Sequence, residues 1–365
     1  MPSGVPYGVY VHIPFCAKRC DYCDFATWTD RDHLMGGYVD ACVAHLARSQ
    51  PVPATSVFFG GGTPSLLPGH QLAQILDAIP RVGAAEVTVE CNPDAVDAAK
   101  LAAYRAAGVN RLSFGVQSFA SHVLLSLNRT HDPANVQTAI SLARDAGFER
   151  VNVDLIYGTP GESVDDWRRT LDGALALDVE HVSAYALTVE PGTPLGQRVA
   201  AGIAPAPDDD DQAEKYEIAD DLLGAAGFQW YEISNWARPG EECRHNLLYW
   251  SQGDYLAIGG AAHGHEAGRR YWNVRTPERY IEYVGAEQSP EAGHELLDAT
   301  VRAEEAVVLA LRTRAGARIA AVPELVDAGL IDVVGDRVVL TRPGRLLASD
   351  VTSRMLLALD RLECQ

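Results

Sequence analysis

Three cysteines near the start of the chain are the residues whose type and spacing most directly predict chemistry. Cys16, Cys20 and Cys23 form a C-x3-C-x2-C arrangement. Thiolates are soft ligands, suited to zinc and to iron–sulfur clusters. A structural zinc site takes four ligands, usually from two separated pairs, and no second pair follows here. Three thiolates on a [4Fe–4S] cube leave one iron without a protein ligand, so the spacing favours a cluster that binds a small molecule at that iron.

Two other interpretations of the triplet are open at this point. His12 is available as a fourth ligand for zinc, or the three cysteines are unrelated structural residues. The chain has seven cysteines, and an odd number argues against a disulfide framework. Isolated cysteines are most often small buried hydrophobes. The three that fall within eight residues need a joint explanation.

Short β-type runs alternate with amphipathic segments over the first half of the chain. Strands are expected at Val9–His12, Ser56–Phe59, Glu86–Glu90, Arg111–Phe114, Val151–Ile156 and His181–Leu187. Helices are expected at Tyr38–Arg48, Gln71–Ile79, Ala95–Ala106, Pro133–Asp145 and Val164–Leu177. This alternation predicts an α/β fold with a parallel sheet. Both a doubly wound sheet and an open (β/α)6 partial barrel satisfy it.

The pattern changes after Glu190. A Pro/Gly-rich connector leads to a helix that starts at the aspartate run 208–211, and the segment 230–275 is expected to be irregular. The tail predicts two or three helices and a β-hairpin around Gly335 and Asp336, which is typical of a winged-helix-like module. We therefore expect a barrel over 1–225, a connecting segment over 226–290 and a small α+β C-terminal domain over 291–365.

Composition limits the partners. The formal net charge is −19 and the sequence pI is about 4.9, so nucleic acid is not expected as a main partner. No apolar run approaches the roughly 18 residues of a membrane-spanning helix. The first residues lack the pattern of a signal peptide, and a cytoplasmic protein is expected.

The cysteine triplet, placed directly after the first expected strand, resembles the signature of the radical S-adenosylmethionine (SAM) family. The resemblance implies a [4Fe–4S] cluster whose open iron chelates the amino and carboxylate groups of SAM. One electron from the cluster then cleaves SAM to a 5′-deoxyadenosyl radical. The family fold is a partial (β/α)6 barrel, so the resemblance selects between the two sheet arrangements.

Further positions resemble, in chain order, the SAM-contacting residues of the coproporphyrinogen dehydrogenase-like branch of this family. They are Tyr10, Gly61, Gly62, Thr63, Glu90, Gln117, Arg129, Asp154 and Ala186. Most follow expected strands, and the carboxyl ends of strands build the sites of α/β barrels. On this resemblance, Glu90 and Asp154 are expected to accept hydrogen bonds from ribose hydroxyls, and Arg129 is expected to pair with the SAM carboxylate.

Two subfamilies of the branch share this framework. The oxygen-independent coproporphyrinogen III dehydrogenases carry an N-terminal extension and a fourth cysteine, in the pattern C-x3-C-x2-C-x-C. The heme chaperones lack the extension and have phenylalanine in that slot. Here the first cysteine is already residue 16, and Phe25 occupies the fourth position. Both features favour the chaperone subfamily.

The segment around His245 is the second discriminator. His245-Asn246 and Tyr249-Trp250 form an H-N-x-x-Y-W pattern, which resembles a motif of the chaperone subfamily. An imidazole ligates heme iron and flat side chains pack on the macrocycle, so His245 is the expected heme residue. Further candidates are Cys243, His263 and His265.

The sequence therefore predicts a heme-binding radical SAM protein that delivers heme to apo-hemoproteins, with a flavodoxin or ferredoxin as electron donor where radical chemistry operates. The resemblance implies little or no decarboxylase activity. Two alternatives share the SAM framework: the coproporphyrinogen III dehydrogenase itself, which decarboxylates a porphyrinogen, and another radical SAM enzyme with a small substrate.

Overall fold

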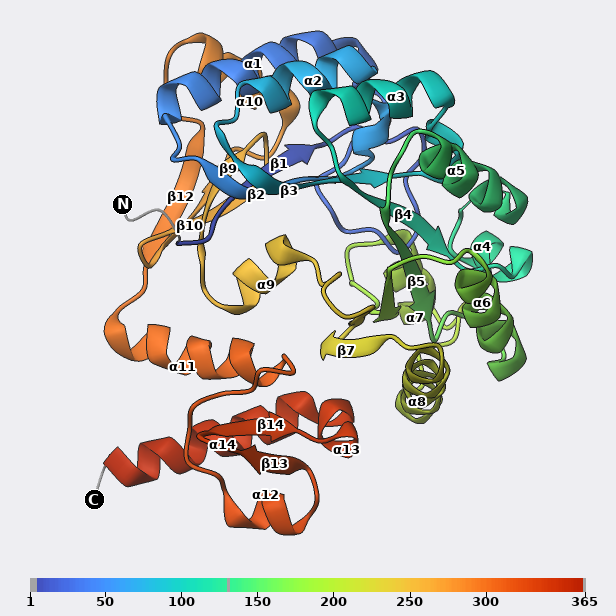
Figure 1. Ribbon diagram of the computed structural model, residues 1–365, viewed down its shortest axis with the longest axis vertical. Helices are drawn as coiled ribbons and strands as arrows, with labels where there is room; N and C mark the ends of the chain where they lie inside the picture. Colours follow the sequence, from blue (N-terminus) through green and yellow to red (C-terminus); the bar gives the residue numbers. More distant parts are fainter. Residues whose placement is uncertain (1–4, 130–131, 364–365) are drawn as a thin grey trace.

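One large β-sheet organises the molecule (Figure 1). The computed structural model describes residues 5–129 and 132–363. Within these residues, twelve strands form one sheet in the order β12-β11-β10-β9-β1-β2-β3-β4-β5-β6-β8-β7. Its first six strands in sequence are β1 (Tyr7–Ile13), β2 (Ala54–Gly61), β3 (Arg81–Cys91), β4 (Arg111–Gln117), β5 (Arg150–Tyr157) and β6 (His181–Ala186).

Strands β1 to β6 are parallel and lie in chain order, and β1 does not pair with β6. This is the expected open (β/α)6 partial barrel, and all six expected strands are confirmed. Strand β5 is a near-continuous run, RVNVDLIY, in which six of eight residues are buried. Such runs are typical of parallel strands covered on both faces.

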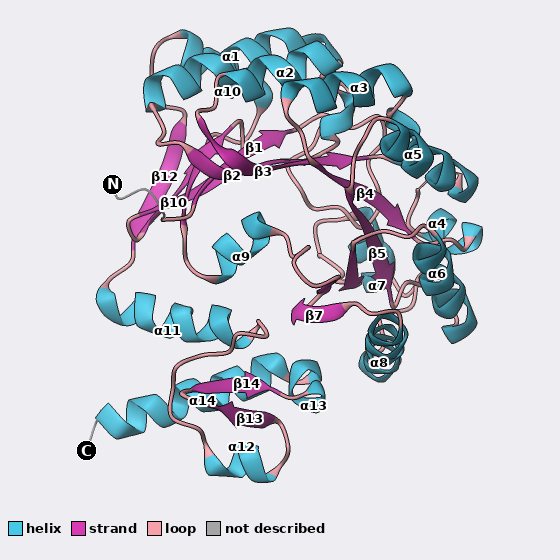
Figure 2. Ribbon diagram, viewed as in Figure 1, coloured by secondary structure: helices cyan, strands magenta, loops and turns pink. Residues whose placement is uncertain are grey.

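Helices cover the outer face of the barrel (Figure 2). They are α1 (Met35–Ser49), α2 (Gly69–Asp77), α3 (Ala98–Ala107), α4 (Ser121–Ser126), α5 (Pro133–Asp145), α6 (Val164–Ala176), α8 (Asp209–Ala225) and α10 (Pro277–Gly285). Helix α7 (Pro194–Ala200) instead contacts the segment that follows β1, where the amide of Leu195 donates to Asp21 O. Local sequence sets several starts. Asp132 caps α5 with Pro133 in its first turn, and Ser163 and Asp166 form a capping box on α6.

The expectation of an irregular segment at 230–275 is wrong. This segment forms β7 (Gln229–Glu232), β8 (Asn235–Ala237), α9 (Arg244–Trp250), β9 (Asp254–Ile258), β10 (His263–Glu266) and β11 (Arg269–Asn273). Strand β9 pairs in parallel with β1, and β10, β11 and β12 (Glu291–Leu296) extend the sheet by antiparallel pairing. The glycines, histidines and aromatics that suggested loops lie in short strands at the two ends of the sheet order, and several of these residues line the cavity instead of a buried core.

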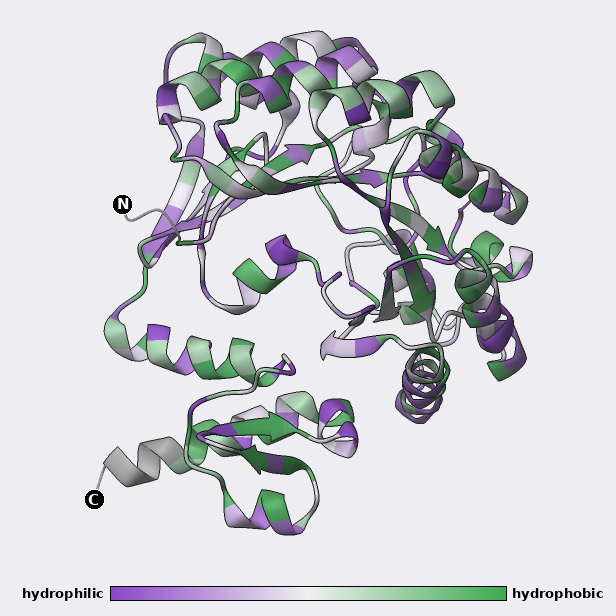
Figure 3. Ribbon diagram, viewed as in Figure 1, coloured by the Kyte–Doolittle hydropathy of each residue, from purple (hydrophilic) through white to green (hydrophobic). Residues whose placement is uncertain are grey.

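A small C-terminal body carries its own core. It consists of α11 (Ala299–Leu311), α12 (Pro323–Asp327), the hairpin β13 (Ile331–Val334) and β14 (Arg337–Leu340), α13 (Arg342–Leu346) and α14 (Ala348–Glu363). The hairpin turns at Gly335 and Asp336 as expected, and its hydrophobic residues stand out in Figure 3. Arg345 joins this body to the barrel through Asp220 of α8, at 2.6 Å. No helix in the described ranges is both long and apolar enough to cross a membrane.

Candidate functional site

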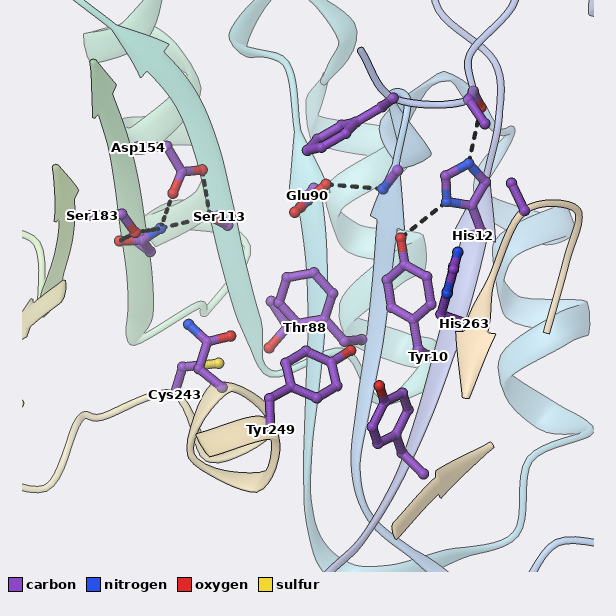
Figure 4. A pocket seen from close by; sticks show the side chains of 18 of the residues that line it. Tyr10, His12, Thr88, Glu90, Ser113, Asp154, Ser183, Cys243, Tyr249 and His263 are labelled. Atoms are coloured by element: carbon purple, nitrogen blue, oxygen red, sulfur yellow. Dashed lines mark hydrogen bonds between the residues drawn. The ribbon is translucent and has the colours of Figure 1, made fainter. Parts of the chain in front are cut away.

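The interior of the barrel contains a cavity of about 700 Å³ (Figure 4). Residues from the parallel strands line it: Tyr10, His12, Phe58, Gly61, Thr88, Glu90, Arg111, Ser113, Asn152, Asp154, His181, Ser183 and Tyr185. The remaining lining residues are Asp24, Phe25 and Ala26, then Cys243, Asn246, Tyr249, Tyr255, Ala261, His263, Trp272, Asn273 and Arg275. The expected site residues Tyr10, Gly61, Glu90 and Asp154 therefore face one space.

Polar residues at alternate positions of four successive strands form much of the cavity wall, and only Glu90 and Asp154 among them were expected site residues. The pairs are Thr88 and Glu90, Arg111 and Ser113, Asn152 and Asp154, and His181 and Ser183. Side chains of a strand alternate between its two faces. A polar residue at every second position of an otherwise apolar strand was therefore a readable signal of a polar barrel interior.

The cysteine loop lies at the carboxyl end of β1 and is closed at its base by backbone hydrogen bonds. The amide of Cys16 donates to Trp28 O at 3.0 Å, and the amide of Trp28 donates to Pro14 O at 2.8 Å. The other side of the barrel holds the loop through Asp21. Its carboxylate accepts a hydrogen bond from Asn128 at 2.8 Å and pairs with Arg198 at 3.2 Å. The loop is thus fixed over the strand ends from both sides.

The glycine turn after β2 fits tightly against this loop. Gly61 has a φ of 110°, a conformation that favours glycine, and a β-carbon there would lie 2.5 Å from the ring of His12. A β-carbon on Gly62 would lie 2.7 Å from Phe15 O and 3.0 Å from Cys16 Sγ. Only glycine at these two positions lets the turn lie against the first cysteine.

The three thiols lie close enough to shift one another's pKa, and hydrogen-bond donors lie beside two of them. Burial raises the pKa of Cys16 and of Cys23, and the neighbouring cysteines add to both shifts. Thr63 donates a hydrogen bond to Cys16 Sγ at 3.6 Å, and Arg129 Nη1 donates to Cys20 Sγ at 3.7 Å. Donors aimed at sulfur stabilise thiolates, so these contacts fit a set of three deprotonated ligands.

Two buried carboxyl groups stand on neighbouring parts of the cavity wall. Burial raises the pKa of Glu90 to about 8, and the nearby Asp154 adds to this shift. Glu90 Oε2 accepts a hydrogen bond from the amide of Gly61 at 3.2 Å. Burial also raises the pKa of Asp154, against hydrogen bonds from Ser113 and Asn152, each at 2.8 Å. Both carboxyl groups are pre-oriented toward a ligand: Asp154 is held by its two donors, while Glu90, which keeps its proton to about pH 8, is able to donate as well as accept.

His12 connects Tyr10 to the cysteine loop. Its Nε2 lies 3.0 Å from Ala26 O and its Nδ1 lies 3.0 Å from the Tyr10 hydroxyl. Burial lowers the pKa of His12 to about 4, so the ring carries one proton at neutral pH. A carbonyl only accepts, so that proton is on Nε2, and the Tyr10 hydroxyl donates to Nδ1. The oxygen of Tyr10 is left to accept a hydrogen bond from a ligand in the cavity.

The remaining expected SAM residues do not line the cavity. They lie at the end of the barrel where the parallel strands end. Gln117 ends β4 with a φ of 64°, a strained conformation for this residue type. Arg129 also donates to Gly115 O on β4, at 2.5 Å. Ala186 is the exposed last residue of β6. The structure therefore places all the strand-end residues on the same end of the barrel as the cysteine loop.

The H-N-x-x-Y-W motif forms helix α9, which lies inside the barrel against β1 and β2. His245 is fully buried, and its ring nitrogens are hydrogen-bonded to Ser56 Oγ at 2.8 Å and to the Tyr249 hydroxyl at 2.9 Å. Burial lowers the pKa of His245 to about 3. Asn246 and Tyr249 face the cavity, whereas His245 holds the helix to β2. In this arrangement neither ring nitrogen of His245 is available to a heme iron.

A cysteine loop at the carboxyl ends of six parallel strands, closed against a glycine turn, defines the class of proteins that bind a cluster and SAM in a partial barrel. A family model described as "Radical SAM superfamily" matches residues 10–174. The chain is similar in fold to a solved structure of coproporphyrinogen III oxidase (HemN) from Escherichia coli, with a TM-score of 0.83 and 23% sequence identity. That match covers 96% of this chain and 89% of the other.

Comparison with sequence relatives identifies the family more narrowly than the superfamily model does. The chain is 46% identical to the heme chaperone HemW of Mycobacterium tuberculosis over 97% of its own length and 95% of the relative. It is 36% identical to the heme chaperone HemW of Bacillus subtilis, over 95% and 98%. The chain belongs to the HemW family of radical SAM proteins. Membership implies a [4Fe–4S] cluster and SAM, and the thiols, glycine turn and carboxyl groups described above fit both.

Proposed function

We propose that this chain is a heme chaperone, which takes up heme and delivers it to apo-hemoproteins such as respiratory enzymes. One observation carries the proposal beyond family membership. Helix α9, built from the H-N-x-x-Y-W motif, contributes Asn246 and Tyr249 to the same cavity that Glu90 and Asp154 line. The segment that resembles a chaperone motif is therefore part of the SAM-binding chamber and not a separate surface.

The residues divide into two groups in this proposal. Cys16, Cys20 and Cys23 hold the cluster, and Thr63 and Arg129 direct hydrogen-bond donors at its sulfur ligands. Such a cluster supplies one electron to a bound SAM, and a flavodoxin or ferredoxin is the proposed source of that electron.

The second group binds SAM itself. Tyr10, Glu90 and Asp154 present acceptors from the wall, while Gly61 and Gly62 let the backbone approach the ligand. Gln117, Arg129 and Ala186 complete the rim. These residues orient the ligand and exclude water, because the carboxyl groups of Glu90 and Asp154 lie in the buried interior.

Titration with hemin tests the chaperone function. The anaerobically reconstituted full-length protein should bind hemin and then transfer it to apomyoglobin, followed by the change in the Soret band. Cys20→Ala should remove most of the iron and sulfide of the reconstituted protein. A chain that neither binds hemin nor passes it to an acceptor would refute the proposal.

Coproporphyrinogen III oxidation is the second candidate, because the fold of HemN matches nearly the whole chain. Two features of this chain weigh against it: the position of the missing fourth cysteine is taken by Phe25, and α9 partly fills the barrel interior. Anaerobic incubation with coproporphyrinogen, SAM and a reductant should yield no protoporphyrinogen. Turnover in that assay would favour the enzyme over the chaperone.

A further inference from the structure

The cavity has one imidazole that is open to a ligand. Three histidines line it, and two of them use both ring nitrogens in hydrogen bonds. His12 binds Tyr10 and Ala26 as described, and His181 lies 2.6 Å from Asn152 Oδ1 and 2.8 Å from the Tyr231 hydroxyl. His263 is exposed, and no hydrogen bond or ion pair joins its ring to another described residue.

The ring of His263 is held in place without using its nitrogens. His263 is the first residue of β10 and pairs across the ladder with Trp272 of β11. Their rings stack with centroids 6.0 Å apart and an angle of 28° between planes. In Figure 4, His263 lies beside His12 and Tyr10, and His12 is in turn hydrogen-bonded to Ala26, three residues after Cys23. A stacked, solvent-accessible imidazole is pre-oriented for a metal and leaves no hydrogen bond to be broken.

One flat apolar side chain, one cation and one carboxylate complete this rim. Phe25 is 60% exposed and faces the cavity from the cysteine loop, so a large apolar side chain is open to a ligand there. Arg275 is exposed, lines the cavity, and has no hydrogen bond or ion pair to another described residue. Asp24 is the exposed carboxylate of the same rim.

We propose that heme docks at this rim, with His263 as a ligand of its iron, Trp272 holding the imidazole by stacking, Phe25 against the macrocycle, and Arg275 facing a propionate. The inference rests on the proposed chaperone function and names the residues that carry it. Imidazole is a common heme ligand, and a guanidinium matches a carboxylate in geometry and charge. The deeper carboxyl groups are left to SAM.

Hemin titration of single variants tests the assignment. His263→Ala should lower the affinity by about tenfold or more, roughly 1.4 kcal/mol of binding free energy, and should change the Soret band. His263→Cys should give the Soret spectrum of thiolate ligation. Arg275→Ala should weaken binding by about three- to tenfold with an unchanged Soret band, because it removes a propionate partner and not an iron ligand. Asp24→Asn should strengthen binding.

Matched controls lie elsewhere on the surface. His70→Ala on α2 and Arg48→Ala on α1 replace exposed residues of the same types, and both should bind hemin like the unmodified chain. Circular dichroism and iron content should match in all variants.

The outcomes separate the two proposals. Failure of the unmodified chain to bind hemin refutes the chaperone function itself. Binding with an identical spectrum and affinity in His263→Ala overturns only the rim site. Loss of the spectrum in His245→Ala, with fold and cluster intact, also overturns the rim site and assigns the ligand to α9.

Discussion

Replacing Glu90 with glutamine should make the stability of the protein less sensitive to pH. Glutamine keeps the shape of the side chain and an oxygen that accepts the hydrogen bond from Gly61, but it never ionises. In the cluster-free chain Glu90 has a pKa of about 8, raised from 4.5 by burial and by Asp154. The unfolded chain releases this proton near pH 4.5, whereas the folded chain retains it until about pH 8.

The direction follows from this difference. The stabilising contribution of protonated Glu90 is fully present below pH 4.5 and is lost as the pH rises to about 8. Each pH unit in that window changes the free energy of unfolding by about 1.4 kcal/mol, so the complete effect is about 5 kcal/mol. Between pH 5.5 and pH 8 it amounts to about 3 kcal/mol on the same slope.

Chemical denaturation under reducing conditions, followed by tryptophan fluorescence, measures the free energy of unfolding at each pH from 5.5 to 9. The lower limit stays above the pI of about 4.9, where solubility is lowest. The free energy of unfolding of Glu90→Gln should increase relative to that of the unmodified chain as the pH rises. Above about pH 8 the difference between the two should stay constant. Glu214→Gln, at an exposed position of α8, is the matched control.

Parallel curves for Glu90→Gln and the unmodified chain over the whole range would refute the reasoning. They would mean that the carboxyl group ionises as readily in the cavity as in water. A second measurement checks the cause of the shift. In an Asp154→Asn background the Glu90 effect should saturate at a lower pH, because a neighbouring negative charge has been removed.

Two further perturbations test other parts of the structure. Gly62→Ala should lower cluster iron and sulfide after reconstitution, because the added β-carbon would lie 3.0 Å from Cys16 Sγ; Gly83→Ala, with open space around its β-carbon, should reconstitute normally. Lys215→Met should lower the free energy of unfolding by about 3–5 kcal/mol, because it leaves the buried Glu162 carboxylate, now 3.2 Å from Lys215 Nζ, without its cation. The double variant Lys215→Met/Glu162→Gln should recover most of that loss in denaturant titrations, and equal losses in the single and double variants would contradict the pairing.

The alternation of strands and helices was predictable because it depends on neighbouring residues. Apolar runs such as that of β5, capping residues such as Ser163 and the glycine–aspartate step of the C-terminal hairpin are features of contiguous sequence. The prediction of an irregular segment at 230–275 was wrong because the strands there are short and lie beside a polar cavity. These strands form by pairing with segments far away in the chain, such as β9 with β1, and a local sequence pattern carries no information about such partners.

The sequence by itself predicted the proposed cluster ligands, because three thiolates on one short loop reach one cluster wherever the rest of the chain goes. The alternation also predicted a parallel sheet, but it left the strand order open between a doubly wound sheet and a partial barrel, and the structure shows the strands in chain order. Only the tertiary structure decided how each histidine is used. His245 is hydrogen-bonded to Ser56, 189 positions away, and so is closed to a ligand, while His263 stacks on Trp272 and its ring nitrogens have no hydrogen-bond partner in the part of the chain that the structure describes. The availability of a side chain depends on burial and on hydrogen-bond partners, and the folded chain supplies both from distant segments.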